Sequence, residues 1–387
     1  MESPASFLSR NAVEVSPEDG LEARLAEGRP LRVKLGLDPT ARDIHLGHTV
    51  VLQKLREFQD LGHTVVLIIG DYTARVGDPS GRSATRPVLA PEEIDAHART
   101  YVEQATKVLA DDERLEIRHN AEWLDMPMED LFRIVRTVTI GQLLERDDFR
   151  KRMAASEPVS LLELLYPVLQ GYDSVAVRSD VEMGGTDQTF NLHMGRALQT
   201  RFDQKPQVVL TMPLLVGVDG VQKMSKSFGN QIGITEPPGD MYGKTLRIPD
   251  TLLESWYDLL LGRRPPDDLG PRDAKRALAR ALVARFHGAA AAAEAEAAFD
   301  QVFIAHEMPD NVPEAAIAAN GGTLHLPEVI AAVFGGSRSE ARRKLAQGGV
   351  KLDGAPLSAE PLDVPAAALD GRVLQLGKRQ FARLRVS

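Results

Sequence analysis

Residues 31–69 read LRVKLGLDPTARDIHLGHTVVLQKLREFQDLGHTVVLII, and this stretch decides the fold class. Residues 31–37 and 64–69 predict two short strands, and the second is apolar and β-branched, as in a sheet covered on both faces. Between the strands, apolar residues recur at helical spacing, and Gly62 ends the pattern. Strand, helix and strand at this spacing form a βαβ unit with a right-handed crossover. The stretch therefore predicts an α/β protein with a doubly wound, Rossmann-like parallel sheet.

A chain of 387 residues predicts two or three domains, because it exceeds what one hydrophobic core usually organises. Further helical patterns and one more strand extend the first domain over residues 1–235; they lie at 91–109, 128–142, 161–174 and 187–199, with the strand at 207–212. Residues 236–320 predict an Ala-rich helical domain, clearest from 273 to 303. Residues 324–387 predict a small α+β domain, in which helices at 326–333 and 339–348 precede short strands.

The composition excludes several classes of protein. The chain has 387 residues, a net charge of −9 and no cysteine, so disulfides, thiolate metal sites and a cysteine nucleophile are ruled out. No apolar run approaches the ~18 residues needed to span a bilayer. Residues 1–30 lack the basic-then-apolar order of a signal peptide. We therefore expect a cytoplasmic protein.

Positive charge is concentrated at the C-terminal end. From Ser337 onward, ten Lys and Arg face five Asp and Glu, a local charge of +5 that leaves −14 on the remainder. A basic module on an acidic body predicts that one domain binds phosphates. A basic tail that is merely solvated is the alternative, and charge alone does not decide between them.

The first chemical motif is His-Leu-Gly-His at 45–48, after the first strand and at the start of the predicted helix. His45 and His48 project from one face of the first turn. A helix N-terminus presents free N–H groups and partial positive charge, which favour a phosphate. Gly47 leaves room for a ligand to approach the backbone. The motif alone also arises by chance, but this strand-turn-helix context favours phosphoryl or nucleotidyl transfer.

The second motif is KMSKS at 223–227, on the loop after the strand at 207–212. Its two lysines and two hydroxyls lie between Gly220 and Gly229, which predicts a mobile cationic loop. Such a loop can close over a triphosphate and neutralise charge as pyrophosphate departs. Lysine-rich loops are usually only solvated, but the pairing with H-x-G-H in an α/β chain favours the functional interpretation.

Together the two motifs resemble the signatures of class I aminoacyl-tRNA synthetases. Within that class, four stretches closely resemble the tyrosyl-tRNA synthetase family: KLGLDPTARDIHLGH (34–48), GDPSGRS (77–83), YPVLQGYDS (166–174) and GGTDQ (184–188). The similarity is greatest to the bacterial subgroup that keeps an unmodified KMSKS, and it extends to the C-terminus. It implies that the chain activates L-tyrosine with ATP to tyrosyl-adenylate and pyrophosphate, then transfers tyrosine to the 3′ end of tRNA(Tyr).

The resemblance implies an ATP site built from both motifs. The implied catalytic residues are Thr40, His45, His48, Arg82, Arg86, Lys223 and Lys226. The implied ATP-binding residues are Gly36, Asp38, His45, Gly47, His48, Gly185, Asp187, Met224, Ser225, Lys226 and Ser227. These groups would stabilise charge at the phosphates, because the tyrosine carboxylate itself attacks the α-phosphorus and needs no general base. Magnesium would accompany ATP without a dedicated metal site on the protein.

The implied tyrosine pocket centres on a helix that presents Tyr166, Gln170 and Asp173 on one face. In the family, the residues matching Tyr166, Gln170 and Asp78 bind the substrate ammonium. The residue matching Asp173 accepts a hydrogen bond from the phenolic hydroxyl, and Gln188 matches a residue near the substrate carboxylate. A buried carboxylate that lacks its phenol partner is costly, so phenylalanine should be rejected.

Two positions in this pocket depart from the pattern of many family members. Lys34 stands where a tyrosine also bonds the phenolic hydroxyl, so it is counted among the implied tyrosine-binding residues. Glu182 stands where some members have glutamine. These departures leave the second partner of the phenolic hydroxyl open.

The resemblance also implies where RNA binds. Residues 324–387 resemble an S4 RNA-binding domain, 236–320 match the anticodon-arm domain, and 115–160 match the dimer and acceptor-stem region. The implied tRNA-binding residues are Arg146, Arg150, Lys151, Arg152, Arg338, Arg342, Arg343 and Lys344. The members of the family are homodimers, and neither a membrane nor DNA is an expected partner.

Three other functions compete with this interpretation. A tryptophanyl-tRNA synthetase shares the fold and both signatures, but the Tyr-Gln-Asp pocket and the S4-like tail oppose it. A small-molecule nucleotidyltransferase could use H-x-G-H, although it would not need two RNA-binding modules. An RNA chaperone derived from a synthetase is a non-enzymatic alternative, which the intact KMSKS motif opposes.

Overall fold

The computed structural model describes residues 2–39, 42–80, 90–303, 312–319, 322–377 and 380–387. The chain divides into two compact units, Met1–His287 and Gly288–Ser387. The division falls inside the helical region predicted over 236–320, and the three-domain boundaries remain a prediction. Within the described ranges, no helix is both long and apolar enough to cross a membrane.

A six-stranded sheet forms the centre of the first unit. Its order is β1-β6-β5-β2-β3-β4, with neighbouring strands parallel except at the antiparallel edge strand β1. The strands are β1 (Glu14–Ser16), β2 (Arg32–Leu37), β3 (Thr64–Ile69), β4 (Leu115–His119), β5 (Val181–Gly185) and β6 (Val208–Met212). Strands β2 and β3 flank a helix as the first stretch of sequence predicts, and the doubly wound parallel sheet is confirmed.

The strand order reverses between β2 and β5. From β2 the chain proceeds through β3 to β4 on one side, and β5 and β6 follow on the other side. In sheets of this kind, the crevice beyond the carboxyl ends of the strands at the reversal is where ligands bind. The fold therefore places the expected site beyond Leu37 and Gly185.

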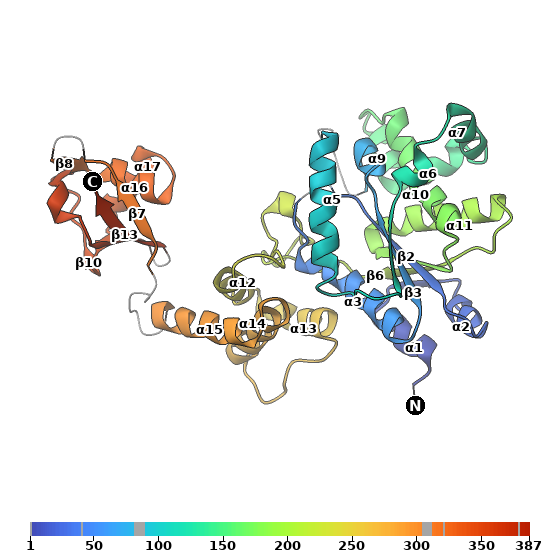
Figure 1. The fold of residues 1–387 in the computed structure, drawn as a ribbon, viewed down its shortest axis with the longest axis horizontal. Coiled ribbons are helices and arrows are strands. Elements are labelled where there is room, and N and C mark those ends of the chain that lie inside the picture. The colour runs from blue at the N-terminus through green and yellow to red at the C-terminus, as the bar shows by residue number, and fades with distance from the viewer. Residues whose placement is uncertain (1, 40–41, 81–89, 304–311, 320–321, 378–379) are drawn as a thin grey trace. The chain divides into compact units, whose positions relative to one another are not determined.

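Helices flank this sheet, and Figure 1 shows α5 on one side of the strands and α10 and α11 on the other. Helices α1 to α6 are Pro4–Ser9, Gly20–Leu25, Leu46–Asp60, Thr73–Val76, Pro91–Ala105 and Ala121–Leu124. Helices α7 to α11 are Met128–Val135, Ile140–Leu143, Asp147–Ala154, Leu161–Val177 and Thr189–Arg201, and the 3-10 turn η1 (Thr186–Gln188) precedes the last of them.

The single helix predicted over 128–142 is wrong, because the structure has two short helices, α7 and α8, there. Thr139 caps the second: its Oγ1 accepts from the Gln142 N–H at 3.3 Å, and Gln142 Oε1 accepts from the Thr139 N–H at 2.9 Å. This reciprocal capping box satisfies N–H groups at a helix start, so a new helix begins at this point.

After β6 the first unit continues with short helices, which are η2 (Lys226–Phe228), α12 (Pro238–Thr245), η3 (Asp250–Leu252), α13 (Leu253–Leu261) and α14 (Pro271–His287). Trp256 and Tyr257 are fully buried in this part, and the Tyr257 hydroxyl donates to the Ala274 carbonyl at 2.8 Å. The helical pattern predicted over 273–303 is interrupted at Gly288, whose φ of +92° favours glycine.

The second unit contains α15 (Ala289–Phe303) and a small α+β fold. One sheet has the order β10-β9-β12-β13-β7, and β8 pairs with β11. The strands β7 to β13 are Glu314–Ile317, Thr323–His325, Val350–Leu352, Ala355–Pro356, Asp363–Pro365, Val373–Leu376 and Gln380–Val386, and η4 is Ala366–Ala368. Helices α16 (Leu326–Phe334) and α17 (Arg338–Ala346) lie within two residues of the predicted ones.

Candidate active site

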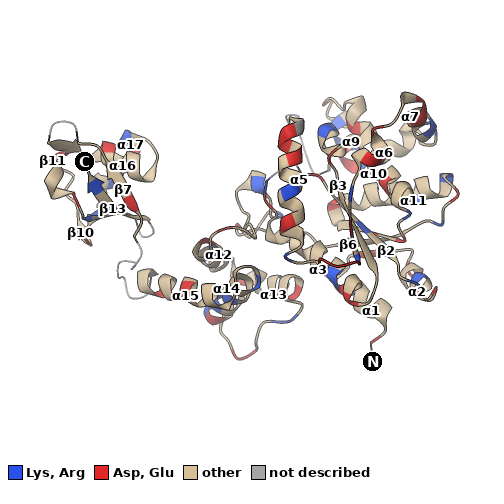
Figure 2. Ribbon diagram, viewed as in Figure 1, with Lys and Arg blue, Asp and Glu red and all other residues tan. Residues whose placement is uncertain are grey.

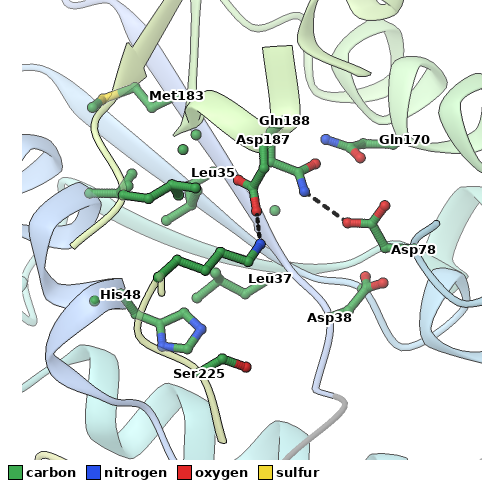
Figure 3. A pocket seen from close by; sticks show the side chains of 18 of the residues that line it. Leu35, Leu37, Asp38, His48, Asp78, Gln170, Met183, Asp187, Gln188 and Ser225 are labelled. Carbon is green, nitrogen blue, oxygen red and sulfur yellow. Dashed lines mark hydrogen bonds and ion pairs between the residues drawn. The ribbon is translucent and has the colours of Figure 1, made fainter. Parts of the chain in front are cut away.

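A cavity of about 300 Å³ lies at the carboxyl end of the sheet, where the strand order reverses. The ends of β2, β3 and β5 line it together with the start of α3, one face of α10 and the loop after β6 (Figure 3). The predicted residues in the lining are Gly36, Asp38, His45, Gly47, His48, Asp78, Tyr166, Gln170, Asp173, Gly185, Asp187, Gln188, Lys223, Met224, Ser225 and Lys226. The fold therefore brings together motifs that lie far apart in the sequence.

Some predicted residues fall elsewhere. Thr40, Arg82 and Arg86 lie outside the described residues, so the structure says nothing of them. Ser227 follows the lysine-rich loop but is not part of the described lining; its hydroxyl lies 2.8 Å from Ser225 Oγ.

His45 and His48 lie side by side at the start of α3, with their ring centroids 4.0 Å apart. The His45 backbone N–H donates to His48 Nδ1 at 3.2 Å, so a neutral His48 ring carries its proton on Nε2. Burial lowers the pKa of His45 to about 2 and that of His48 to about 4. At pH 7 both rings are neutral, and they can donate hydrogen bonds to a ligand without carrying a full positive charge.

The two lysines of the KMSKS loop have different surroundings. Lys223 Nζ forms an ion pair with Asp187 Oδ2 at 2.6 Å across the cavity (Figure 3). Lys226 also lines the cavity, is exposed, and makes no ion pair with any residue that the structure describes. One ammonium is therefore held by a carboxylate of the site, and the other is available to an incoming anion.

Asn230, a residue that the sequence analysis missed, holds this loop in shape. Its buried amide donates to Asp219 Oδ2 at 2.9 Å and to the Lys223 carbonyl at 3.1 Å, and its Oδ1 accepts from the Ser225 N–H at 2.8 Å. Gly217 makes room for it, because a Cβ there would lie 2.4 Å from the Asn230 side chain. The only signal in the sequence is its place three residues after the motif.

Asp38, at the carboxyl end of β2, connects this part of the cavity with helix α10. Thr73 Oγ1 donates to Asp38 Oδ1 and the Tyr166 hydroxyl donates to Asp38 Oδ2, each at 2.8 Å. Burial raises the pKa of Asp38 to about 7, and the nearby charge of Asp78 acts in the same direction. Gly70 is required beside it, since a Cβ there would lie 2.0 Å from Asp38 Oδ1.

Asp173 occupies a buried position on the same face of α10. Trp123 Nε1 donates to Asp173 Oδ1 at 2.8 Å, and Asn120 Nδ2 lies 3.5 Å from Asp173 Oδ2. Burial raises the pKa of Asp173 to about 7, and the charge of Lys34 acts against this rise. The sequence does not indicate Trp123 and Asn120, because no local pattern predicts β4, the strand whose carboxyl end they follow.

Two further polar groups face the cavity beside this helix. Gln188 Nε2 donates to Asp78 Oδ2 at 2.8 Å (Figure 3). Gln170 Oε1 is buried and has no hydrogen-bond partner among the described residues. A buried acceptor without a partner costs free energy, so Gln170 is suited to receive a donor from a ligand.

Lys34 lies behind the cavity and is not part of its described lining. Its side chain is fully buried, and Nζ donates to Glu182 Oε1 at 2.8 Å, to Ser174 Oγ at 2.9 Å and to the Gln170 carbonyl at 3.2 Å. All three N–H groups of the ammonium are thus used within the protein. Glu182 is the strand partner of Lys34 in the sheet, so both unusual residues form one buried ion pair.

Two of the four arginines and lysines predicted near the acceptor stem lie inside the protein, which differs from the prediction of a surface cluster. Arg152 is buried and forms an ion pair with Glu163 at 2.7 Å. Arg146 is 6% exposed, and its guanidinium donates hydrogen bonds to Asp148, Asn191 and Ser80. Lys151 is exposed, and Arg150 is exposed and forms an ion pair with Asp147.

In the second unit, positive residues lie along α17 (Figure 2). Arg342 and Arg343 are exposed on this helix. Arg338 is paired with Glu328 at 2.8 Å and Lys344 with Glu340 at 3.1 Å. Helix α17 therefore presents two exposed guanidinium groups that have no carboxylate partner among the described residues, beside two cations that have one.

A doubly wound sheet that brings an H-x-G-H helix start and a KMSKS loop to one cavity defines a class I aminoacyl-tRNA synthetase. The family described as tRNA synthetases class I (W and Y) matches residues 26–304. A tyrosine–tRNA ligase of Moorella thermoacetica is 50% identical over 98% of this chain and 94% of its own length. Tyrosine–tRNA ligase 2 of Vibrio vulnificus is 48% identical over 100% of this chain and 99% of its own. The chain belongs to the bacterial tyrosyl-tRNA synthetase family.

A solved structure shares the fold at lower sequence identity. The C-terminally truncated mitochondrial tyrosyl-tRNA synthetase of Aspergillus nidulans superimposes with a TM-score of 0.66, at 23% identity, over 78% of this chain and 95% of that one. The class I α/β fold is thus found well beyond the close relatives.

Proposed function

We propose that this protein is a tyrosine–tRNA ligase that works in two steps in one cavity. In the first step, a carboxylate oxygen of tyrosine bonds to the α-phosphorus of ATP and pyrophosphate leaves. In the second step, a hydroxyl of the terminal ribose of tRNA(Tyr) attacks the activated carbonyl, and AMP leaves. The observation that carries the proposal is that the His45–His48 pair, the KMSKS loop and the polar face of α10 all line the same cavity.

The polar face of α10 fits tyrosine. Gln170 Oε1 is an unpaired buried acceptor, and Asp78 lies nearby on the cavity wall, so both can receive the substrate ammonium. Asp173 would accept from the phenolic hydroxyl, with Trp123 holding its other oxygen. Phenylalanine would leave the buried Asp173 without that partner, which costs about 1–3 kcal/mol or more for a charged group.

The opposite wall fits the triphosphate of ATP. His48 can donate from Nε2, and the Lys226 ammonium is not ion-paired within the described chain. Both groups would stabilise negative charge as the bond to pyrophosphate breaks. Lys223 would leave Asp187 to join them, and Asp187 would then be free for the ribose hydroxyls.

Magnesium would enter with ATP, bound by phosphate oxygens and water. Among the described residues, no group of three or more His, Cys, Asp or Glu side chains could hold a metal ion. The ion would supply additional neutralisation of the phosphates, while the protein residues named above orient the substrates.

The second unit would bind the tRNA. Its helices α16 and α17 and the following sheet support the S4-like assignment, and Arg342 and Arg343 would contact backbone phosphates. The helical region after residue 235 would contact the anticodon arm. Because the product is used in protein synthesis, we place the protein in the cytoplasm.

The direct test is amino-acid-dependent ATP–pyrophosphate exchange with each of the twenty amino acids. We expect exchange with tyrosine alone, because the first step does not require tRNA. Exchange with tryptophan would place the chain in the other branch of its family. No exchange with any amino acid, combined with tight tRNA binding, would favour the RNA chaperone.

We also propose that the protein is a homodimer. Exposed apolar side chains follow one another on α7 to α10: Met128, Phe132, Ile140, Met153 and Leu161 are between 52% and 73% exposed. Exposed apolar side chains gathered in one region of the chain are typical of an association surface. The region overlaps the segment that in this family forms the dimer.

Replacing Phe132 and Leu161 by aspartate should convert the dimer to a monomer, because two charges would be buried without partners at the contact. Light scattering coupled to size-exclusion chromatography measures the mass directly. The exposed Leu61, replaced in the same way, serves as the control and should leave the mass unchanged. A monomeric unmodified protein, or a double variant that stays dimeric, would contradict this assignment.

A further inference from the structure

Arg146 is buried although it belongs to a segment rich in surface charge. It lies between α8 and α9, and its side chain is 6% exposed. The guanidinium lies over the rings of Phe149 and Phe190, with its carbon 5.1 and 6.0 Å from their centroids. Asp148 accepts from its Nε at 2.7 Å and balances its charge. Because Asp148 accepts from Nε, the other two nitrogens of the guanidinium group can donate hydrogen bonds to other residues.

Those two nitrogens contact residues that are hydrogen-bonded to the lining of the cavity. One donates to Ser80 Oγ at 2.8 Å and the other to Asn191 Oδ1 at 3.0 Å. Ser80 lies two residues after Asp78, and its backbone N–H donates to Asp78 Oδ1 at 2.8 Å. Ser80 and Asn191 are themselves buried, so these bonds are shielded from water.

In the series of hydrogen bonds from Arg146 to the cavity, the donor and the acceptor of each bond are fixed. Because Arg146 donates to Asn191 Oδ1, the amide nitrogen of Asn191 is left to donate, and it does so to Gln188 Oε1 at 2.9 Å. Gln188 therefore presents its own nitrogen to Asp78 Oδ2, at 2.8 Å. Each amide has only one orientation that satisfies its neighbours. Both branches of this hydrogen-bond network end at Asp78, because its other oxygen accepts from the Ser80 N–H.

We propose that Arg146 is a positioning residue for the amino-acid substrate. It fixes the Gln188 amide through Asn191, and it fixes the Asp78 carboxylate through Ser80 and through a direct ion pair at 3.9 Å. The proposal rests on the proposed function, in which Asp78 receives the ammonium of tyrosine, and Gln188 holds Asp78 in place. It assigns Arg146 to the amino-acid site and removes it from the predicted contacts with tRNA.

The two roles differ in a measurable way. A residue that positions the amino-acid site affects ATP–pyrophosphate exchange, which needs no tRNA. A residue that contacts only the acceptor stem affects the charging of tRNA and leaves exchange unchanged. Arg150, exposed on α9 four residues further on, provides a matched control, because Asp147 at the surface is its one ion-pair partner among the described residues.

The experiment compares Arg146→Met with Arg150→Met in exchange assays without tRNA. We expect Arg146→Met to raise the KM for tyrosine about tenfold to a hundredfold, since a small misplacement of binding groups has effects of this size. The KM for ATP should change little, and Arg150→Met should leave both constants unchanged. Normal exchange by Arg146→Met, or a loss confined to tRNA charging, would overturn the proposal.

A second variant separates positioning from folding. Asn191→Asp keeps an acceptor for Arg146 but has no N–H for Gln188 Oε1, so it breaks the chain of bonds at one point. We expect it to raise the KM for tyrosine in the same direction as Arg146→Met, while thermal unfolding shows a folded protein. Equal losses for tyrosine and ATP in both variants would show a general structural role and would reject the proposal. If the unmodified protein exchanged another amino acid, the same comparison with that amino acid would still test Arg146.

Discussion

Replacing Lys226 by alanine should lower the rate of tyrosine-dependent ATP–pyrophosphate exchange by a factor of about 10²–10³. The side chain lines the cavity and has no carboxylate partner among the described residues, so its charge is available to the phosphates. The loss should appear mainly in kcat, because charge develops on the departing pyrophosphate only as the transition state forms. Steady-state exchange at saturating tyrosine and ATP measures it.

Lys205→Ala is the control for the loss of one lysine. Lys205 is exposed and pairs with Glu27 away from the cavity lining, so its removal should leave exchange unchanged. A Lys226→Ala variant that retained its kcat but needed more ATP would show that this lysine acts in ground-state binding. That outcome would contradict the role assigned to it.

Replacing Lys34 by methionine should reduce the free energy of unfolding by about 3–5 kcal/mol, since it leaves the buried Glu182 carboxylate without its cationic partner. The Lys34 and Glu182 side chains are 0% and 1% exposed, so water cannot compensate for the loss. Denaturant unfolding followed by circular dichroism measures the change. A second replacement, Glu182→Met, should restore much of the stability, because two apolar side chains can fill the space of a buried ion pair.

The surface pair of Arg56 and Asp60 on α3 provides the matched comparison. Their side chains are 37% and 55% exposed, so Arg56→Ala should cost no more than about 1 kcal/mol. If Lys34→Met cost equally little, the buried pair would not be important for stability. A double variant less stable than Lys34→Met would show that Glu182 has other essential partners.

The sequence was sufficient for the central part of the fold and insufficient for three strands of its sheet, β1, β4 and β5. The β2–α3–β3 unit was predictable because its apolar periodicity is local and unbroken. Strand β4 contains alternating charged residues, as in Leu115–His119, and β5 ends in two glycines, so neither has the usual composition of a buried parallel strand. Their place in the sheet comes from pairing with β3 and β2.

The candidate site likewise combines residues of continuous motifs, which could be predicted, with residues whose partners are distant in the sequence, which could not. The H-x-G-H and KMSKS motifs are continuous in sequence, and the structure brings both to the cavity. The arrangement around Arg146 and Lys34 depends on partners 45 to 148 residues away, which no local pattern indicates. The burial of a lysine in a strand, or of an arginine in a basic segment, cannot be predicted from the neighbouring sequence, because it depends on partners that only the tertiary structure brings close.

The buried ion pair also has a consequence for how the sheet assembles. Lys34 and Glu182 are directly opposite in the register of β2 and β5. Ser174 of α10 hydrogen-bonds to both side chains, and Gln207, the residue before β6, donates to Glu182. A slip of one residue between the strands would turn one of these side chains to the other face and bury a charge alone. The pair therefore penalises misaligned strands during folding, at the junction where the two halves of the sheet meet.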